Sequence, residues 1–593
     1  MRSLIIYDAV DIIFYVMSVN FLIIASLGPL RSNFYLRFTN INLSKKFIAK
    51  KCKERLRLGI KSKTQREFNK MKFTKNVIAI MSLVALTATG AIADNPKRGG
   101  TLVASLTGTP RVLNPAVQSG IVTGLVGSQL FAAPLRYDEG WNPQPYLAKS
   151  WEVSEDGLSV TLNLQEDATF HDGTPIKSSD VAFSVKIIQE FHPFKSMFAP
   201  VTSVDTPDEH TAVLNLAHPH PALMLAMSGQ LMSIIPEHIY GDGQDPKNHP
   251  RNNENLVGSG PFKLVEFVPG QHVIMERYDG YWEEGLPYLD RIVARIVPDS
   301  SSRAIALQNG EIHLSTFENE PTIVNRMVAA DGISVSNNGY GGIGPIDWLA
   351  MNVTRGPLKD VRVRQAIAYA IDKNFILKAV MRNTAKDALT GVHPDSPLYN
   401  PNVNAYEFDL DKANALLDEA GFPMENGKRF DITMELVPFP GYKPQTEYIK
   451  QALSKVGIMV TIESVPDFPS WAKIMGTMDF DMSLDSVYNW GDPVIGVNRT
   501  YMTSNIAKGV WSNTQGYSNA RVDELLDAAA RENNQDKRAA LYAEFQEIVN
   551  AEVPIYYLNA VPMHTFYSDK VGNPPVDGIW ATSSPMDKVW LKD

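Results

Sequence analysis

Regular patterns of apolar and polar residues run along most of the chain after residue 98. In GGTLVAS (99–105), apolar residues stand between turn formers, which predicts a first strand. WEVSEDGLSVTLNL (151–164) predicts two short strands joined by a hairpin turn at Glu155-Asp156-Gly157. The segment VAFSVKIIQEF (181–191) fits the spacing of a helix moderately well.

Three longer helices are predicted in the second half of the chain. VRVRQAIAYAIDKNFILKAV (361–380) places an apolar stripe on one helical face, formed by Val363, Ala366, Ile367, Ala370 and Ile371. Asp409 is a suitable N-cap for LDKANALLDEAG, which Gly421 ends. A last helix is expected over 521–549. Strands alternate with helices, which is the pattern of an α/β protein with mixed sheets.

The first 93 residues differ from the rest in charge. They contain 16 Lys and Arg but 4 Asp and Glu, a net charge of +12, so residues 94–593 carry −21 of the overall −9. From Met71 to Ala93, a charged start, an apolar run and an A-x-A end predict a signal peptide cleaved after Ala93. We expect translation to begin at Met71, with 1–70 as an upstream extension. The alternative is a signal anchor over the apolar run 12–30.

Composition narrows the function of residues 94–593. Their acidity argues against nucleic acid or an anionic membrane surface as a partner. The only cysteine, Cys52, lies upstream, so the exported part has neither a disulfide nor a lipid-anchored cysteine. No second hydrophobic span follows residue 93, so we expect this part to be soluble.

No catalytic or metal-binding pattern emerges from the sequence. GYGGIGP (339–345) lacks the Gly-Lys-Ser/Thr of a phosphate-binding loop, and we expect a flexible strand approach or a turn near the ligand. His218 and His220 are each followed by proline and have no carboxylate or thiolate pair nearby, which predicts an exposed turn. Neither G-x-S-x-G nor H-E-x-x-H occurs. We therefore predict a protein that is not an enzyme and that has no cofactor or metal.

Six segments in order resemble family 5 extracellular solute-binding proteins, the oligopeptide- and dipeptide-binding components of ABC importers. These segments are Trp151–Ser184, Gly258–Gly270, Tyr278–Trp282, Leu289–Ile312, Pro357–Asp372 and Phe408–Phe422. The resemblance implies an α/β Venus-flytrap fold of the type II (cluster C) periplasmic binding proteins, with two mixed-sheet lobes and an extra subdomain. It implies lobe I over 94–140, 256–345 and 561–593, the extra subdomain over 141–255, and lobe II over 346–560.

The resemblance also implies a role. A monomeric periplasmic protein would bind a peptide between its lobes and deliver it to a permease with two membrane subunits and two ATPases. Closure of the lobes would exclude water and strengthen each polar contact. An opine, an oligosaccharide or a nickel chelate is the alternative solute. A secreted hydrolase is the alternative of another class, and it lacks a nucleophile with its base.

The segment Ser483–Tyr501 resembles the ligand-contacting loop of lobe II. In dipeptide-binding relatives, an aspartate three residues before an Asp-Pro pair holds the α-ammonium of the ligand. Here the pair begins at Asp492, and the matching residue is Asn489. An amide does not neutralise a cation, a difference on the order of 1–3 kcal/mol. Where relatives have an arginine for the ligand carboxylate, the matching segment 437–445 has only Lys443.

Three alternatives can replace these two anchors. Asp492 can take the amine, Arg499 can take a carboxylate, or the ligand lacks one terminus. Against this, Asp-Pro often only caps a turn, and Arg499 can pair with a neighbouring carboxylate as a structural strut. Flat aromatic faces are available for side chains or sugar rings. The complete set of candidate ligand-binding residues is Trp490, Asn489, Asp492, Arg499, Tyr488, Trp348, Tyr340 and Lys443, with core packing as the alternative role of Trp348 and Tyr340.

Overall fold

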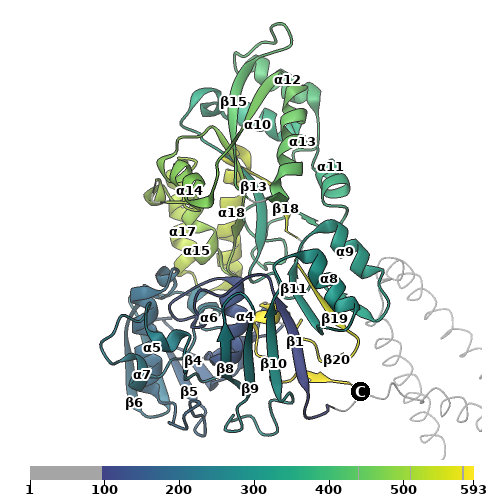
Figure 1. The fold of residues 1–593 in the computed structure, drawn as a ribbon. Coiled ribbons are helices and arrows are strands. Elements are labelled where there is room, and N and C mark those ends of the chain that lie inside the picture. Colours follow the sequence, from purple (N-terminus) through teal and green to yellow (C-terminus); the bar gives the residue numbers. More distant parts are fainter. Residues whose placement is uncertain (1–95, 439, 508, 562, 577–579, 593) are drawn as a thin grey trace, which may run out of the picture. The chain divides into compact units, whose positions relative to one another are not determined.

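Two large mixed sheets and one smaller antiparallel sheet organise the chain (Figure 1). The computed structural model describes residues 96–438, 440–507, 509–561, 563–576 and 580–592. The predicted signal peptide and the predicted upstream extension lie outside the described residues.

Lobe I is built on a seven-stranded sheet with the order β12-β19-β11-β1-β10-β9-β8. The predicted first strand forms β1, which pairs in parallel with β10 and β11 near the centre of the sheet. The strands are β1 (Thr101–Leu106), β8 (Phe262–Val268), β9 (His272–Arg277), β10 (Arg291–Ile296), β11 (Leu314–Glu318), β12 (Ile333–Ser336) and β19 (His564–Ser568). Its helices include α4 (Ile121–Leu130), α8 (Ser300–Gln308) and α9 (Pro321–Val328).

An extra subdomain contains the four-stranded antiparallel sheet β4-β5-β7-β6. The predicted hairpin is confirmed: β4 and β5 pair, and Gly157 has the positive φ of 68° that the turn requires. The predicted helix over 181–191 is also confirmed, as part of α5. The elements are β4 (Ala148–Val153), β5 (Ser159–Leu164), α5 (Ser178–Phe191), β6 (Val201–Asp208), β7 (Thr211–Leu216), α6 (Ala222–Ala226) and α7 (Glu237–Tyr240).

Lobe II is built on a six-stranded sheet with the order β14-β18-β13-β17-β15-β16. One face packs against α10, α12 and α13, and the other against α17 and α18. The strands are β13 (Pro345–Met351), β14 (Lys386–Asp387), β15 (Phe430–Leu436), β16 (Ile458–Ser464), β17 (Met482–Tyr488) and β18 (Ile555–Ala560). The helices include α10 (Val361–Ala370), α11 (Lys373–Phe375), α12 (Leu410–Glu419), α13 (Lys443–Ser454), α14 (Phe468–Thr477), α17 (Ala520–Arg531) and α18 (Gln535–Glu552).

Two of the predicted long helices are wrong in extent. The helix expected over 521–549 is two helices, because Asn534 adopts an extended backbone and its side chain accepts from the N–H of Lys537 at 3.0 Å, which caps α18. The helix expected over 361–380 ends at Ala370, where Asp372 caps the next helix in the same way. The Asp409 N-cap is confirmed, at 2.9 Å from the N–H of Lys412.

The chain crosses between the two large sheets at 337–344, before β13, and again after β18, from Val561 on. The two crossings are joined where the N–H of Val561 donates to the carbonyl of Pro345 at 2.8 Å. The glycine-rich segment 339–345 therefore forms the first crossing. Gly344 has φ 55°, and a Cβ there would lie 2.9 Å from the Cβ of Asn489. A side chain at position 344 would thus separate lobe II from this crossing.

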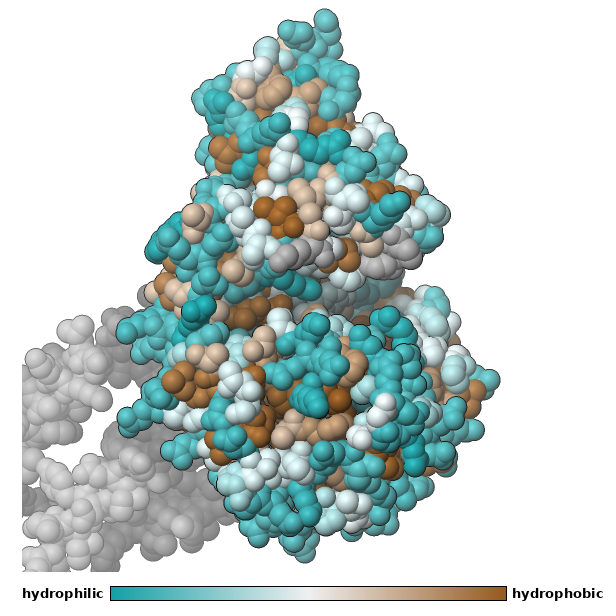
Figure 2. All heavy atoms as spheres, turned by 90° about the vertical axis from the view of Figure 1, so that its left-hand side faces the viewer, coloured by the Kyte–Doolittle hydropathy of each residue, from teal (hydrophilic) through white to brown (hydrophobic). Residues whose placement is uncertain are grey.

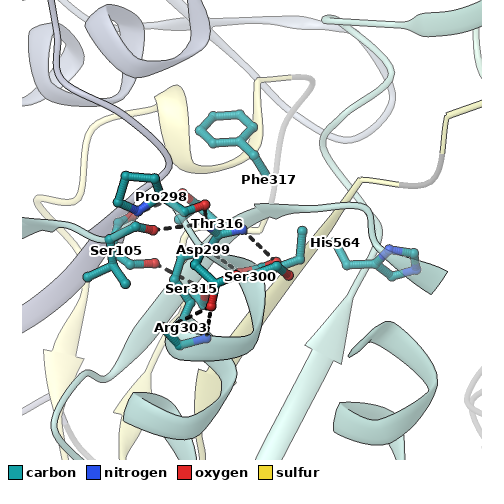
Figure 3. A network of polar contacts seen from close by, with 12 residues as sticks. Ser105, Pro298, Asp299, Ser300, Arg303, Ser315, Thr316, Phe317 and His564 are labelled. Carbon is teal, nitrogen blue, oxygen red and sulfur yellow. Dashed lines mark hydrogen bonds and ion pairs between the residues drawn. The ribbon is translucent and has the colours of Figure 1, made fainter. Parts of the chain in front are cut away.

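A buried ion pair joins α8 to β11 in lobe I (Figure 3). Both oxygens of Glu318 accept from the guanidinium of Arg303, and the hydroxyls of Ser300 and Ser315 donate to them at 2.6 Å each. Arg303 also donates to the carbonyl of Pro298 at 2.7 Å. Because the partners satisfy both ions, this charge pair is compatible with complete burial.

Glu318→Gln should destabilise the protein by about 3–5 kcal/mol, because it leaves the Arg303 cation buried without its anion. Urea unfolding at pH 7 measures the effect. Glu166→Gln is the control, since Glu166 pairs with Lys149 on the surface and its loss should leave the unfolding midpoint nearly unchanged. Equal unfolding midpoints for the two variants would contradict this role.

Candidate ligand-binding site

A loop of lobe II, residues 488–499, is held directly against the first crossing. As β17 ends, the N–H of Asn489 points at the carbonyls of Ile343 (3.1 Å) and Gly344 (3.2 Å). Trp490 and Gly491 then have positive φ values of 53° and 81°, which turn the chain away from the sheet. The position of this loop is therefore fixed by backbone hydrogen bonds to the segment that connects the lobes.

Aromatic residues of this loop pack against the extra subdomain. The ring of Trp490 stacks on Tyr488 with centroids 6.0 Å apart, and its centroid lies 5.0 Å from that of Phe194. Gly491 has a positive φ of 81°, and a Cβ there would lie 2.1 Å from Cδ2 of Leu225, so glycine favours this close approach. Figure 2 shows a recess between the parts that carry the two large sheets, with hydrophobic residues inside it. The loop is thus one of the places where lobe II contacts the extra subdomain.

Asn489 is almost completely buried and only half satisfied. Its Oδ1 accepts from the backbone N–H of His393 at 2.8 Å. Its Nδ2 is buried and has no hydrogen-bond partner among the described residues. A ligand carbonyl or carboxylate oxygen in reach of this amide would satisfy it.

Arg499 is a half-buried cation without a carboxylate partner among the residues that the structure describes. Its Nε donates to the carbonyl of Gly496 at 3.2 Å and its Nη2 to that of Tyr488 at 3.3 Å. The guanidinium carbon lies 5.9 Å from the ring centroid of Phe194. Burial lowers the pKa of Arg499 to about 10. Because a buried cation is stabilised by an anion, this guanidinium is suited to receive a ligand carboxylate.

Asp492 already has a cationic partner within the protein. Its two oxygens accept from the guanidinium of Arg538 at 2.7 Å each, and Oδ1 also caps the helix that follows by accepting from the N–H of Val494 at 2.9 Å. The Arg538 guanidinium holds the pKa of Asp492 below its usual value, although burial opposes this. A ligand ammonium there would compete with Arg538 for both oxygens.

The remaining sequence candidates lie apart from the loop. Trp348 is buried beneath α17 and α18, 6.4 Å from the ring of Tyr557. The hydroxyl of Tyr340 accepts from the N–H of Phe317 at 3.1 Å and lies 2.7 Å from Thr565 Oγ1, which ties the first crossing to lobe I. These contacts agree with core packing.

Lys443 begins α13 and is exposed. It lines a groove of about 430 Å³ together with Thr446, Lys450 and Thr461. This groove lies over β16, two strands away from β17 at the edge of the sheet. The structure therefore does not bring Lys443 to the loop that carries Arg499.

Two buried carboxylates were not among the sequence candidates. Burial raises the pKa of Asp347 on β13 to about 6 and that of Asp485 on β17 to about 7. Asp485 accepts from the indole N–H of Trp511 at 2.6 Å. Neither has a basic residue in ion-pair range among the described residues. Their signal in the sequence is an acid inside an apolar strand, IDWLAM and SLDSVY.

The predicted exposed turn is wrong at His220. This ring is buried, and its Nε2 lies 3.0 Å from the carbonyl oxygen of Met197. In the described part of the chain, no three His, Cys, Asp or Glu side chains are grouped closely enough to hold a metal ion. No helix among the described residues has the length and hydrophobicity to cross a membrane.

Two lobes with mixed sheets, joined by two crossings, define a two-lobed α/β protein. The family model "Bacterial extracellular solute-binding proteins, family 5 Middle" matches residues 142–509. The chain belongs to family 5 of the bacterial extracellular solute-binding proteins. The resemblance and the fold class predicted from the six segments are thereby confirmed.

Curated relatives and solved structures are similar over most of the chain. Heme-binding protein A of Haemophilus influenzae is 29% identical over 439 residues, covering 69% of this chain and 78% of its own. The dipeptide-binding protein of Escherichia coli is 28% identical over 505 residues, covering 80% and 91%. The structure of the periplasmic binding protein DppA from Helicobacter pylori, in complex with peptide STSA, is similar with a TM-score of 0.70 and 25% identity, covering 84% and 99%.

Asp485→Asn should raise the melting temperature more at pH 8 than at pH 4.5. The folded pKa of about 7 lies above the unfolded value of 3.8, so the neutral form favours folding, and this stability is lost as pH rises through 7. Asparagine keeps the neutral form at every pH. We expect the gain over the wild type to be about 2 °C or more larger at pH 8, as measured by differential scanning calorimetry.

The exposed acid Asp431, on β15 of the same sheet, provides the control. Asp431→Asn should change the melting temperature to a similar extent at both pH values. A gain for Asp485→Asn that is the same at pH 4.5 and pH 8 would show that the carboxylate is not held in its neutral form.

Proposed function

We propose that the chain is a periplasmic solute-binding protein that binds a peptide between its lobes and delivers it to an ABC importer. In this role it releases the peptide unchanged and is not an enzyme. It acts as a monomer, exported by the segment 71–93, and its partners are the two permease subunits and their ATPases. Membership of family 5 supports the role, and the names of two similar proteins, a dipeptide-binding protein and one in complex with a peptide, support the ligand.

The observation that carries the ligand class is the guanidinium of Arg499. It lies in the loop that meets the extra subdomain, and it lacks an acidic partner among the described residues. A free peptide C-terminus supplies the missing carboxylate. The unpaired Nδ2 of Asn489 donates to a second ligand oxygen. Trp490 and Tyr488 give apolar surface for a side chain, because both rings line this contact.

Calorimetric titration with alanine peptides of two to six residues, each with a free or an amidated C-terminus, tests the proposal. We expect the wild type to bind free acids about 10- to 100-fold more tightly than amides, since hydrogen bonds to charged groups contribute about 1.5–3 kcal/mol. Arg499→Gln should weaken binding of the free acids by the same factor and abolish the difference.

Arg521→Gln is the matched control, because Arg521 loses the same group on the surface, where it pairs with Glu544. It should leave the affinities unchanged. If no peptide binds the wild type while an opine, an oligosaccharide or a nickel chelate does, the peptide assignment is wrong. If peptides bind but Arg499→Gln leaves their affinity intact, the assignment of the carboxylate site is wrong.

A further inference from the structure

Asp347 lies at the centre of a buried set of oxygen atoms in lobe II. Its Oδ2 accepts from Gln445 Nε2 at 2.8 Å and from Asn559 Nδ2 at 3.0 Å. The carbonyl oxygens of these two amides, Gln445 Oε1 and Asn559 Oδ1, are buried without a hydrogen-bond partner among the described residues. All three side chains are at most 3% exposed. The set thus combines one carboxylate with two unused acceptors.

This set of three residues has unused hydrogen-bond acceptors, which a hydrogen-bond donor would satisfy. Each amide turns its NH₂ toward the same carboxylate oxygen, so each unpaired carbonyl oxygen lies within about 5 Å of that oxygen. Buried acceptors without donors cost free energy, and a buried carboxylate costs more unless it is paired. A positively charged group with several N–H donors would satisfy all three residues together.

The residues described around Asp347 include a second acid but no basic side chain in ion-pair range. Asp485 stands on the neighbouring strand β17, and its carboxylate interacts electrostatically with that of Asp347. The phenols of Tyr442 and Tyr488 are near both acids. Tyr442 donates to Ser486 Oγ at 2.8 Å, so its proton is not directed at Asp347. Two carboxylates and no basic side chain in ion-pair range remain among the residues described there.

The position relative to Arg499 agrees with a dipolar ligand. In the pairing of β13 with β17, Asp347 lies opposite Ser486 and Pro345 lies opposite Tyr488. Arg499 donates to the carbonyl of Tyr488. Along the paired strands, the backbone of Asp347 is thus two residues, or about 7 Å, from the position opposite the carbonyl that Arg499 contacts. A short peptide carries an ammonium group at one end and a carboxylate at the other, so one ligand can engage one group of each sign.

We propose that Asp347, with Gln445 and Asn559, forms a subsite that receives the ammonium group of the bound solute. The inference rests on the proposed function and narrows its ligand class to short peptides with a free amine. The same chemistry would accept an N-terminal ammonium or the ammonium of a lysine side chain. Asn489 is neutral, so this position of the loop provides no negative charge for the ammonium group. The carboxylate of Asp347, on the strand next to β17, provides that charge instead.

Titration of trialanine and N-acetyl-trialanine into the wild type and Asp347→Asn tests the subsite. Asparagine retains the shape and removes the charge. We expect acetylation to weaken binding to the wild type at least about 10-fold, and Asp347→Asn to weaken trialanine by a similar factor without affecting the acetylated peptide. N-acetyl-trialanine with a C-terminal lysine should regain affinity if the subsite also accepts a side-chain ammonium.

A second variant guards against a folding defect. Gln445→Met removes one acceptor and leaves Asp347 in place, and it should weaken trialanine by a smaller factor. Glu435→Gln is the control, because Glu435 is a buried acid on β15 of the same sheet outside this set. It should leave both affinities unchanged. Melting curves check that every variant is folded.

The outcomes separate this inference from the proposed function. If both peptides bind the wild type equally, or Asp347→Asn weakens them equally, peptide binding stands and the ammonium subsite is wrong. If only an uncharged solute binds the wild type, both are wrong. A melting temperature that 100 mM KCl raises in the wild type but not in Asp347→Asn, with no amine dependence of binding, would assign the set to a metal cation and overturn the proposal.

Discussion

The backbone hydrogen bonds between Asn489 and the first crossing are the constraint on which the contact between the lobes depends. They hold the end of β17 against the carbonyls of Ile343 and Gly344. The next residue, Trp490, is fixed on its other side by Phe194 of the extra subdomain. Three parts of the fold therefore meet at two consecutive residues. A rotation of lobe II about the crossings would change the contact of Trp490 with Phe194, because the two rings belong to different parts of the fold.

Charge compensation separates the structural ions from those available to a ligand. Arg303 with Glu318 and Arg538 with Asp492 are buried pairs in which both ions are satisfied by two-point contacts. Such pairs are costly to break and hold the fold in one geometry. The half-buried cation Arg499 and the buried acid Asp347, by contrast, have no partner of opposite charge within the described residues. These two groups have opposite charges and lie in segments next to the crossings. A ligand that carries both an ammonium group and a carboxylate can pair with both of them.

Much of the fold could be predicted because it depends on local signals. The hairpin at Gly157 and the N-cap at Asp409 each depend on a few adjacent residues, so the sequence predicts them directly. The six family segments predict the order of the elements along the chain. The apolar spacing over 521–549 predicts one long helix, because it continues through the break between α17 and α18. The side chain of Asn534 competes with helix formation there, and a cap of this kind inside a periodic run is easily overlooked.

The candidate site could be predicted only in part, because it depends on which charges meet in space. Asp492 was a reasonable candidate from its motif, yet Arg538 lies 46 residues further along the chain and occupies it. Asp347 stands in an apolar strand, a visible anomaly, but its two amides come from α13 and β18. Their convergence follows from sheet order. Strands β17, β13 and β18 are adjacent, so an acid on β13 lies beside the strand that leads into the loop of Asn489. Which charged groups come together therefore follows from the order of strands in the sheet and not from their distance along the sequence.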